Sequence, residues 1–297
     1  MNFADLQVFK AVVEEGGVAR AARKLHRVPS NVTTRIKHLE ETVGMPLFHR
    51  DRQRLHLSPS GELLLGYADR LLQLSEEARS VVSGAAPAGL FRLGSLESTT
   101  ASRLPELLAR FHRLYPDVRL ELATNTNDGL MGALAERRID AAFTAEVPSV
   151  AGFDYLPVFR EKLVVISNPD HPPIRNARDA QDESLIAFPN GCAYRRVLQR
   201  WLGRESLAAV RVLELSSYHA IVACVASGTG IALVPEAVLA TMPHAKVLSH
   251  PIPKSQGEIT TPLVWRAGEI SPPVLALRKL VEEIAVKSRG GKARKAA

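Results

Sequence analysis

Apolar residues recur with helical spacing in three stretches of the first 45 positions. The first stretch stops at Gly16 and Gly17. The third begins at Pro29, which suits the first turn of a helix, and stops at Gly44. Three short helices with a tight connection before the third predict a helix-turn-helix. The apolar positions are Phe3, Leu6, Phe9, Val12 and Val13, then Val18, Ala21, Ala22 and Leu25, then Val32, Ile36, Leu39 and Val43.

The face of the third predicted helix opposite its apolar positions is polar and compact. It carries short hydroxyl side chains and cations, namely Ser30, Thr33, Thr34, Lys37 and His38. Such side chains approach base edges and phosphates closely, which favours contact with double-stranded DNA. The residues of this helix that we expect to bind DNA are Ser30, Asn31, Thr33, Thr34, Arg35 and Lys37.

Residues 46–57 predict a two-stranded wing with a basic tip. The tip holds Arg50, Arg52 and Arg54, which we expect to contact DNA. Arginines in this position can lie along the phosphate backbone or enter a narrow minor groove. A solvated hairpin turn is the alternative, but the neighbouring helix-turn-helix favours DNA contact.

A longer helix is predicted to begin at Pro59, with Ser58 as its N-cap. Its apolar residues follow each other at spacings of three and four, which is a heptad seam. A seam on a helix that leaves a small DNA-binding domain indicates a homodimer, which presents two recognition helices to a pseudo-palindromic site. Residues 84–89 predict a linker. The seam consists of Leu64, Tyr67, Leu71, Leu74, Ala78 and Val81.

The remaining chain alternates between predicted strands and predicted helices. From residue 90 to residue 143 the order is strand, helix, strand, helix, strand, which implies a parallel sheet with a ligand crevice at the carboxyl ends of its strands. The expected strands are 90–96, 118–123, 138–143, 163–167, 185–188, 210–215, 231–234 and 262–266. The expected helices are 103–114, 127–136, 192–202, 218–226 and 272–286.

The net charge of +7 is distributed unevenly. Residues 1–58 hold 10 Lys and Arg against 6 Asp and Glu, and residues 287–297 hold 5 Lys and Arg and no acid. A basic N-terminal segment on a nearly neutral body favours a polyanion partner at that end. We expect the basic tail to be disordered.

Several function classes are disfavoured by what the sequence lacks. Cys192 and Cys224 make no disulfide framework, and the N-terminus has no secretory-signal pattern. The longest weakly charged stretch, 220–242, is interrupted by glycine and proline, so we expect no membrane span and a cytoplasmic protein. The sequence contains no GxSxG, P-loop, HExxH or GxGxxG motif, so we expect no enzyme, no cofactor and no bound metal.

The N-terminal block resembles the DNA-binding segment of LysR-type transcriptional regulators. The resemblance rests on residues 25–40, on the run from Gly44 to Arg50 and on the run from Leu57 to Gly61. It departs from the family pattern at Pro29, where these regulators usually carry a DNA-reading Gln, and at Thr33, where Ser is common. The family's base preference is therefore not transferred to this chain.

The resemblance implies an α+β multi-domain protein with a winged helix-turn-helix over 1–58, a linker and dimerisation helix over 59–89, and a periplasmic-binding-protein-like effector domain over 90–297. Two α/β subdomains joined by two crossovers would hold a small-molecule effector between them. Subdomain I is expected at about 90–162 and 266–286, subdomain II at about 163–265, and the basic tail at 287–297. A homodimer that pairs into a homotetramer is also implied.

Hydroxyl and amide groups are expected to dominate the effector cleft, because the loops that follow the predicted strands carry them. Arg195 adds a guanidinium that can pair with a carboxylate. This lining favours a small polar effector such as an organic acid or an amino acid. The expected effector-binding residues are Ser98, Thr99, Thr100, Asn125, Thr126, Asn127, Cys192, Tyr194, Arg195 and Ser217.

Two other functions stay open on the sequence. Cys192 is expected at a helix N-terminus, where a thiol pKa can fall, so a redox-sensing regulator is the first alternative. A small-molecule-binding protein or an enzyme without a DNA role is the second. The 58 N-terminal residues argue against the second alternative.

Overall fold

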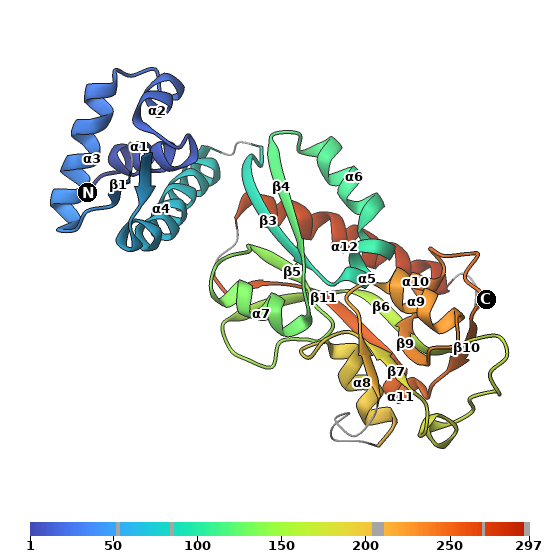
Figure 1. Ribbon diagram of the computed structural model, residues 1–297. Coiled ribbons are helices and arrows are strands. Elements are labelled where there is room, and N and C mark those ends of the chain that lie inside the picture. The colour runs from blue at the N-terminus through green and yellow to red at the C-terminus, as the bar shows by residue number, and fades with distance from the viewer. Residues whose placement is uncertain (52–53, 84–85, 204–210, 269–270, 294–297) are drawn as a thin grey trace. The chain divides into compact units, whose positions relative to one another are not determined.

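A computed structural model describes residues 1–51, 54–83, 86–203, 211–268 and 271–293 (Figure 1). Contacts divide the chain into two compact units, Met1–Ala85 and Ala86–Ala297, and each is described by itself. The finer domain boundaries suggested by the sequence stay predictions. Among the described residues, no helix combines the length and the apolar character that crossing a bilayer requires.

Three helices share one apolar core in the N-terminal unit. They are α1 (Phe3–Glu14), α2 (Val18–Lys24) and α3 (Pro29–Val43), in agreement with the three predicted helices. Gly44 ends α3 in the left-handed conformation, with φ at 76°, which glycine adopts without strain. The fully buried side chains of this core include Leu6, Phe9, Ala21, Val32, Leu39 and Leu47.

A two-stranded wing follows α3, as predicted. Its strands β1 (Phe48–Asp51) and β2 (Arg54–Leu57) pair antiparallel. The carboxylate of Glu40 in α3 accepts hydrogen bonds from the backbone N–H groups of Leu47 at 2.8 Å and Phe48 at 3.3 Å. Glu40 therefore fixes the start of the wing relative to the third helix.

Helix α4 (Pro59–Ser83) divides its apolar residues between two faces. Leu64 and Leu71 pack against the core of their own unit, whereas Tyr67 and Leu74 are exposed. Two of the six predicted seam residues therefore pack inside the unit, while Tyr67, Leu74 and Ala78 are exposed, and the role of the seam in a dimer stays a prediction. The side chain of Val81 lies outside the described residues. The exposed large apolar side chains of α4 are Leu63, Tyr67, Leu74 and Val82.

The second unit is built on one sheet with the strand order β4-β3-β5-β11-β6-β9-β7-β8, and β10 pairs with β6. The pairs of β3 with β4 and β5 are parallel, and so are the pairs of β7 with β8 and β9, as the strand–helix alternation predicts. The strands are β3 (Gly89–Ser95), β4 (Val118–Thr124), β5 (Ala141–Phe143), β6 (Phe153–Ser167), β7 (Leu185–Ala187), β8 (Val212–Glu214), β9 (Ile231–Pro235), β10 (Leu248–Pro251) and β11 (Glu258–Arg266).

Two long antiparallel strands join the halves of this sheet. β6 and β11 pair from Phe153 to Lys162, with a register shift between Thr261 and Pro262. β11 also pairs with β5, and the second half of β6 pairs with β9 and β10. We call the part around β3, β4 and β5 subdomain I and the part around β7, β8 and β9 subdomain II. β6 and β11 are the two crossovers that the family resemblance implied (Figure 1).

Helices cover the sheet in both subdomains. α6 and α12 bury apolar side chains of subdomain I, including Phe91, Phe111 and Leu277. The helices are α5 (Glu97–Ser102), α6 (Leu104–Leu114), α7 (Asn127–Ala135), α8 (Ala193–Trp201), α9 (Tyr218–Ala226), α10 (Glu236–Leu239), α11 (Lys254–Gly257), α12 (Pro272–Ala293) and the short 3-10 helix η1 (Ala177–Ala180).

Several elements differ from the predictions, and the short elements η1, α10, β10 and α11 were not predicted. The short helix α5 replaces the loop expected after the first strand of the sheet. β6 begins ten residues earlier than the strand predicted at 163–167, because its first half pairs with β11. α12 continues to Ala293, so the tail expected to be disordered from residue 287 is helical as far as the structure describes it.

Candidate DNA-contact face and effector pocket

The polar face of α3 is exposed. Its exposed residues include Ser30, Asn31, Thr33, Thr34 and Lys37. The hydroxyls of Thr33 and Thr34 donate to the backbone carbonyls of Pro29 and Ser30, each at 3.0 Å. These bonds hold the rotamers, while each hydroxyl oxygen keeps the capacity to accept a further hydrogen bond. The face therefore presents ordered, short polar side chains.

Arg35 points elsewhere. Its guanidinium lies 2.8 Å from the carboxylate of Asp5, a buried residue of α1, and His38 Nδ1 lies 3.2 Å from the other carboxylate oxygen. A buried carboxylate is stable only when it is paired and hydrogen-bonded. Arg35 therefore positions α3 against α1, and the DNA contact expected of it stays a prediction.

The wing arginines are described only in part. Arg50 and Arg54 belong to β1 and β2, but their side chains lie outside the described residues, and so does the whole of Arg52. Contact between these three residues and DNA stays a prediction.

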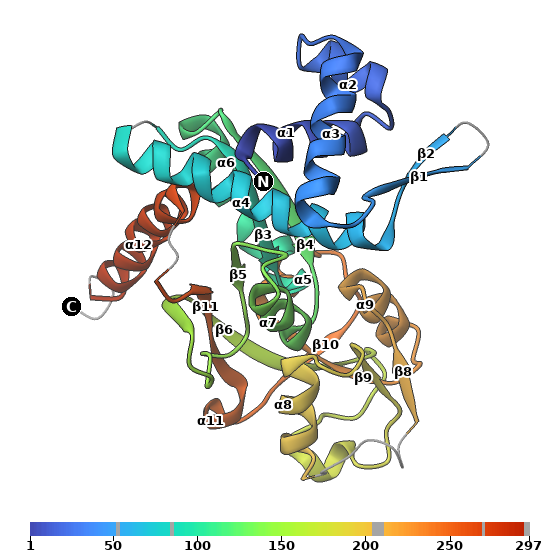
Figure 2. The same cartoon turned by 90° about the vertical axis from the view of Figure 1, so that its left-hand side faces the viewer.

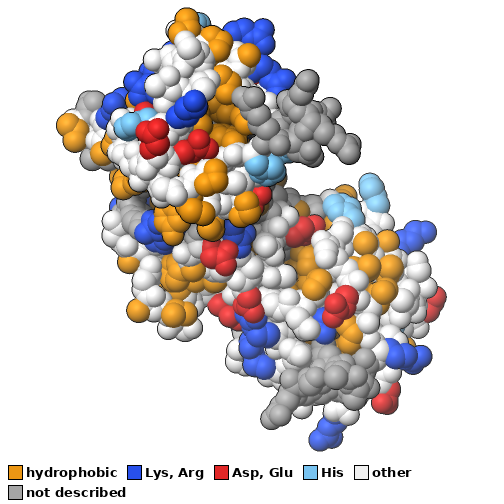
Figure 3. Space-filling view, turned by 60° about the vertical axis from the view of Figure 1, so that its left-hand side comes forward, with side chains coloured by type: hydrophobic (Ala, Val, Ile, Leu, Met, Phe, Trp, Pro, Cys, Tyr) orange, Lys and Arg blue, Asp and Glu red, His pale blue; other side chains and the backbone are white. Residues whose placement is uncertain are grey.

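A second group of cations surrounds α2, and the sequence pattern did not single it out. Arg20, Arg23, Lys24 and Arg27 are exposed, and Figure 3 shows Lys and Arg side chains gathered at the top of the N-terminal unit, over α2. Arg27 donates to the side-chain oxygen of Asn31 at 3.1 Å, which ties this group to α3. Positive charge beside the polar face favours phosphate contacts. The four Lys and Arg residues within positions 20–27 could have been noticed in the sequence.

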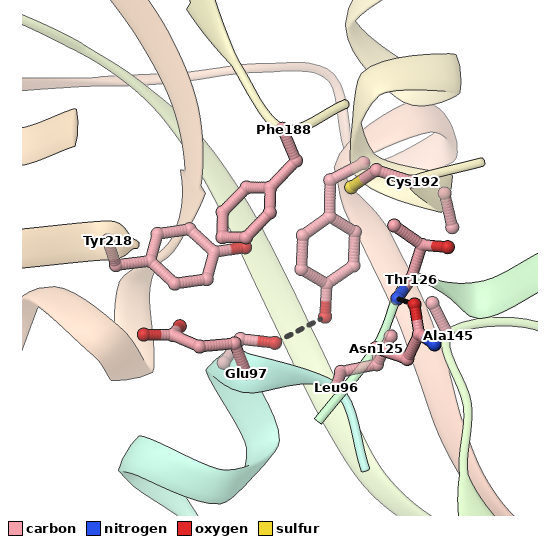
Figure 4. A pocket seen from close by; sticks show the side chains of 11 residues that line it. Leu96, Glu97, Asn125, Thr126, Ala145, Phe188, Cys192 and Tyr218 are labelled. Carbon is pink, nitrogen blue, oxygen red and sulfur yellow. Dashed lines mark hydrogen bonds between the residues drawn. The ribbon is translucent and has the colours of Figure 1, made fainter. Parts of the chain in front are cut away.

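One pocket lies where the parallel strands of both subdomains end. Its residues follow β3, β4 and β5 in subdomain I and β7 and β8 in subdomain II (Figure 4). The carboxyl ends of the strands are where open α/β sheets bind ligands. The free space is about 20 Å³, enough for a water molecule, so the pocket is nearly closed in this conformation. It is lined by Leu96, Glu97, Ser98, Asn125, Thr126, Ala145, Phe188, Cys192, Ala193, Tyr194 and Tyr218.

Half of the predicted effector residues line this pocket: Ser98, Asn125, Thr126, Cys192 and Tyr194. Ser98 and Tyr194 come from different subdomains, and their hydroxyl oxygens are 3.3 Å apart. Burial raises the pKa of the Tyr194 phenol well above its usual value, so this hydroxyl stays protonated and can donate. The pair closes one side of the pocket.

The other half lie outside this lining, and their contact with an effector stays a prediction. Thr99 is buried outside the lining, Thr100 donates to the Leu96 carbonyl, and the Asn127 side chain accepts from the Ala145 N–H. Ser217 precedes α9 and is not in the lining. Arg195 donates to the Phe188 carbonyl and to Glu214, both in subdomain II, and is not in the lining.

Glu97, Phe188 and Ala145 are lining residues that the prediction missed, and Tyr218 was expected only to face the crevice. Burial raises the pKa of the Glu97 carboxyl, and a hydrogen bond from the Tyr218 backbone together with nearby His219 offsets part of that rise. Glu97 directly follows Leu96 at the end of the first strand of the sheet. Because residues at that position are expected near the ligand crevice, the sequence could have identified Glu97 as a lining residue.

Arg196 joins the subdomains at the rim of the pocket. From α8 it reaches Asp128 of α7 at 3.2 Å and Glu146 after β5 at 3.0 Å. Figure 2 shows α7 and α8 next to each other. The backbone carbonyl of Gly191 accepts from the Asp128 N–H at 3.4 Å, which adds a second contact between the same segments. These contacts link the two subdomains beside the pocket.

Family models match both units. The model described as "Bacterial regulatory helix-turn-helix protein, lysR family" matches residues 3–62, and the model described as "LysR substrate binding domain" matches residues 84–285. The chain is 32% identical over 278 residues to the HTH-type transcriptional regulator GltR of Bacillus subtilis (strain 168), covering 93% of this chain and 94% of the relative. It is 32% identical over 286 residues to the HTH-type transcriptional regulator SoxR of Arthrobacter sp. (strain TE1826), covering 96% of both.

Solved structures share the fold. A full-length variant of OxyR from Pseudomonas aeruginosa superposes with a TM-score of 0.70 at 23% identity, covering 96% of this chain and 94% of the other. Full-length CbnR in complex with its target DNA gives a TM-score of 0.65 at 21% identity, covering 96% and 100%. The chain therefore belongs to the LysR family of DNA-binding transcriptional regulators, with an effector-binding domain in its second unit.

Proposed function

We propose that this regulator binds promoter DNA through its winged helix-turn-helix and alters that binding when a small polar molecule occupies the pocket between subdomains I and II. The observation that carries the proposal is the pocket itself, which is lined from both subdomains at the carboxyl ends of their parallel strands. An occupant that fits this space contacts both subdomains, so it changes the balance between open and closed arrangements. The proposal places the protein in the cytoplasm and gives it no catalytic role.

On the DNA side, Ser30, Asn31, Thr33, Thr34 and Lys37 are proposed to contact bases and phosphates. Exposure of all five on one helix supports this assignment. Arg50, Arg52 and Arg54 of the wing are proposed to contact the DNA backbone or a minor groove. A homodimer through α4, paired further into a homotetramer, would present two such units to a pseudo-palindromic site.

On the effector side, Ser98, Asn125, Thr126 and Tyr194 are proposed to hydrogen-bond the ligand, which would be an organic acid, an amino acid or a similar small molecule. The hydroxyl and amide groups of these residues can both donate and accept. A redox-sensing role for Cys192 is not adopted, because burial raises the pKa of its thiol and the thiolate is the reactive form.

Nuclease footprinting of the promoter region upstream of the chain's own gene, with the purified full-length protein, tests the DNA half. Thr34→Ala is expected to weaken binding by about 1 kcal/mol, roughly fivefold in Kd. Thr42→Ala is the matched control, because Thr42 makes the same kind of hydrogen bond within α3, to the His38 carbonyl at 2.8 Å, but lies at the far end of the helix. No protection by the unsubstituted protein at low salt would contradict the proposal.

Ser98→Ala tests the effector half. A thermal-shift screen of small carboxylates, amino acids and polyamines supplies a ligand, whose affinity should fall in this variant. DNA binding without the ligand should stay at the unsubstituted level. If Ser98→Ala abolishes DNA binding while the protein remains folded, the assignment of the pocket to an effector is wrong.

A further inference from the structure

The charges around the pocket identify a class of effector. We infer that the molecule bound here carries a protonated amine, an alkylammonium group that pairs with the carboxylate of Glu97 and packs against the rings of Phe188 and Tyr218. The inference rests on the proposed function, because it takes this pocket as the effector site.

Glu97 is the charged member of the lining, and among the described lining residues there is no Lys or Arg. Its carboxylate accepts a hydrogen bond from the backbone N–H of Tyr218, while Oε2 is buried and has no hydrogen-bond partner. A buried acceptor without a partner costs free energy that a donor from the ligand recovers. An ammonium group supplies both the donor and the opposite charge.

Aromatic rings form the adjoining wall. The ring centroids of Phe188 and Tyr218 are 4.8 Å apart with an angle of 51° between the planes, and Figure 4 shows the Glu97 carboxylate beside the Tyr218 ring. Cations are attracted to the faces of such rings, and the methylene groups next to an ammonium are apolar enough to pack on them. A carboxylate beside two aromatic rings suits an alkylammonium better than it suits an anion.

The guanidinium groups around the pocket each bind a carboxylate, although Nε of Arg195 is buried without a hydrogen-bond partner. Arg103 binds the buried carboxylate of Glu161 through two hydrogen bonds, at 2.9 and 3.1 Å. Arg195 binds Glu214 and Arg196 binds Asp128 and Glu146, as described above. His219, next to Tyr218, is exposed and lies near the Glu97 carboxylate. Of the basic groups named here, only His219 could therefore offset the repulsion between a carboxylate ligand and Glu97.

The small free space fits the size of the proposed group. A volume of about 20 Å³ admits one small polar group, so an ammonium can enter before the subdomains move apart to admit the rest of a larger molecule. Burial raises the pKa of the Glu97 carboxyl in the empty pocket, and a bound cation would favour its ionised form.

Three probes of nearly equal shape test the inference on the full-length protein: propylammonium, propionate and 1-propanol. Isothermal titration calorimetry and thermal shift should detect propylammonium at concentrations at which the other two have no effect. Glu97→Gln keeps the shape of the side chain and removes its charge, and should weaken propylammonium binding roughly tenfold or more. Glu106→Gln, an exposed glutamate on α6 outside the pocket, is the matched control and should bind like the unsubstituted protein.

Preference for propionate, equal binding of all three probes, no binding of propylammonium, or unchanged affinity in a folded Glu97→Gln protein would overturn the inference. Phe188→Leu gives a second test, since loss of the ring should weaken the binding of propylammonium more than the binding of propanol.

Footprinting with each probe separates this inference from the proposed function. If propylammonium binds and DNA protection does not change, the ligand class stands and the regulatory role of the pocket fails. If propionate alters protection and propylammonium does not bind, the regulatory role stands and the ligand class is wrong.

Discussion

Cys192 illustrates how burial changes the chemistry of a single residue. It precedes α8, where a helix N-terminus favours a thiolate, but only 8% of it is exposed. Desolvation raises the pKa of the thiol, while backbone N–H groups of Tyr194 and Arg195 act in the opposite direction without reversing the rise. We expect iodoacetamide at pH 7 to modify Cys192 more slowly than a free cysteine in solution, because the thiolate is the reacting form. Peptide mass spectrometry over time measures the rate, with free cysteine as the reference, and rapid modification of Cys192 would restore the redox alternative.

The sequence predicted the pocket residues whose location depends on where a strand ends. It did not predict the contacts of residues for which the direction of the side chain determines the partner. Ser98, Asn125 and Thr126 closely follow strands that end at one edge of the sheet, so they were expected in the lining and lie there. Arg195 and Arg196 are adjacent in α8, and their different partners depend on which way each points. The alternation of polar and apolar residues does not determine that direction, so the sequence does not tell which of the two arginines reaches subdomain I.

Helix α4 carries a prediction about assembly. Its apolar residues Tyr67 and Leu74 are exposed, while Leu71 packs against the core of the N-terminal unit. Leu74→Asp should convert the proposed dimer to a monomer, because a charge at the centre of an apolar seam is costly to bury. Leu71→Asp should instead reduce the melting temperature, since it places a charge against the core. Sedimentation equilibrium and circular dichroism separate the two effects, and a Leu74→Asp protein that remains dimeric would exclude this face as the interface.

Strand β10 and the loop before η1 enclose a buried histidine that makes stability depend on pH. His250 Nε2 lies 2.8 Å from the Ser167 hydroxyl, and Nδ1 accepts from the Ile174 N–H at 3.3 Å. Burial, with a smaller contribution from nearby His171, lowers the pKa of His250. A lowered pKa means that the unfolded chain binds a proton more readily than the folded one. Stability is therefore full above pH about 6.5 and falls as the pH decreases through the folded-state value.

Thermal unfolding measured from pH 8 to pH 5 checks this prediction. The melting temperature should fall less steeply with decreasing pH in His250→Gln than in the unsubstituted protein, because Gln does not titrate. His244→Gln, at an exposed position, should follow the unsubstituted protein. Identical pH profiles for all three proteins would show that His250 does not contribute.

Elements were predictable from periodicity when they were long and regular. The helices α1, α3, α9 and the start of α12 have clear apolar stripes, and each was expected within a residue or two. The first half of β6 was missed because its partner, β11, is about a hundred residues away in the sequence. Long-range pairing supplies the hydrogen bonds that make it a strand, and no local pattern reports that pairing.

At the scale of the effector-binding unit, the balance between open and closed arrangements depends on contacts that cross from α8 to α7. Gly191 has φ at 89°, and a Cβ at this position would lie 3.1 Å from the Thr126 hydroxyl oxygen, so only glycine brings the two segments this close without strain. The Arg196 ion pairs lie beside this contact and are partly exposed. They contribute little to overall stability, but they act between the subdomains, where a small free energy changes which arrangement is populated.

Arg196→Gln should therefore open the pocket without unfolding the protein. Loss of about 1 kcal/mol of contact across the rim raises the open population roughly fivefold. The amide N–H of Asp128 is a direct reporter, because it donates to the Gly191 carbonyl across the rim, and its hydrogen exchange should accelerate by a similar factor. Arg195→Gln is the matched control, since its ion pair with Glu214 lies within subdomain II and its loss should leave exchange at Asp128 unchanged. Equal exchange in both variants would mean that Arg196 does not hold the subdomains together, and closure would then depend on the Ser98–Tyr194 contact and the loop at Gly191.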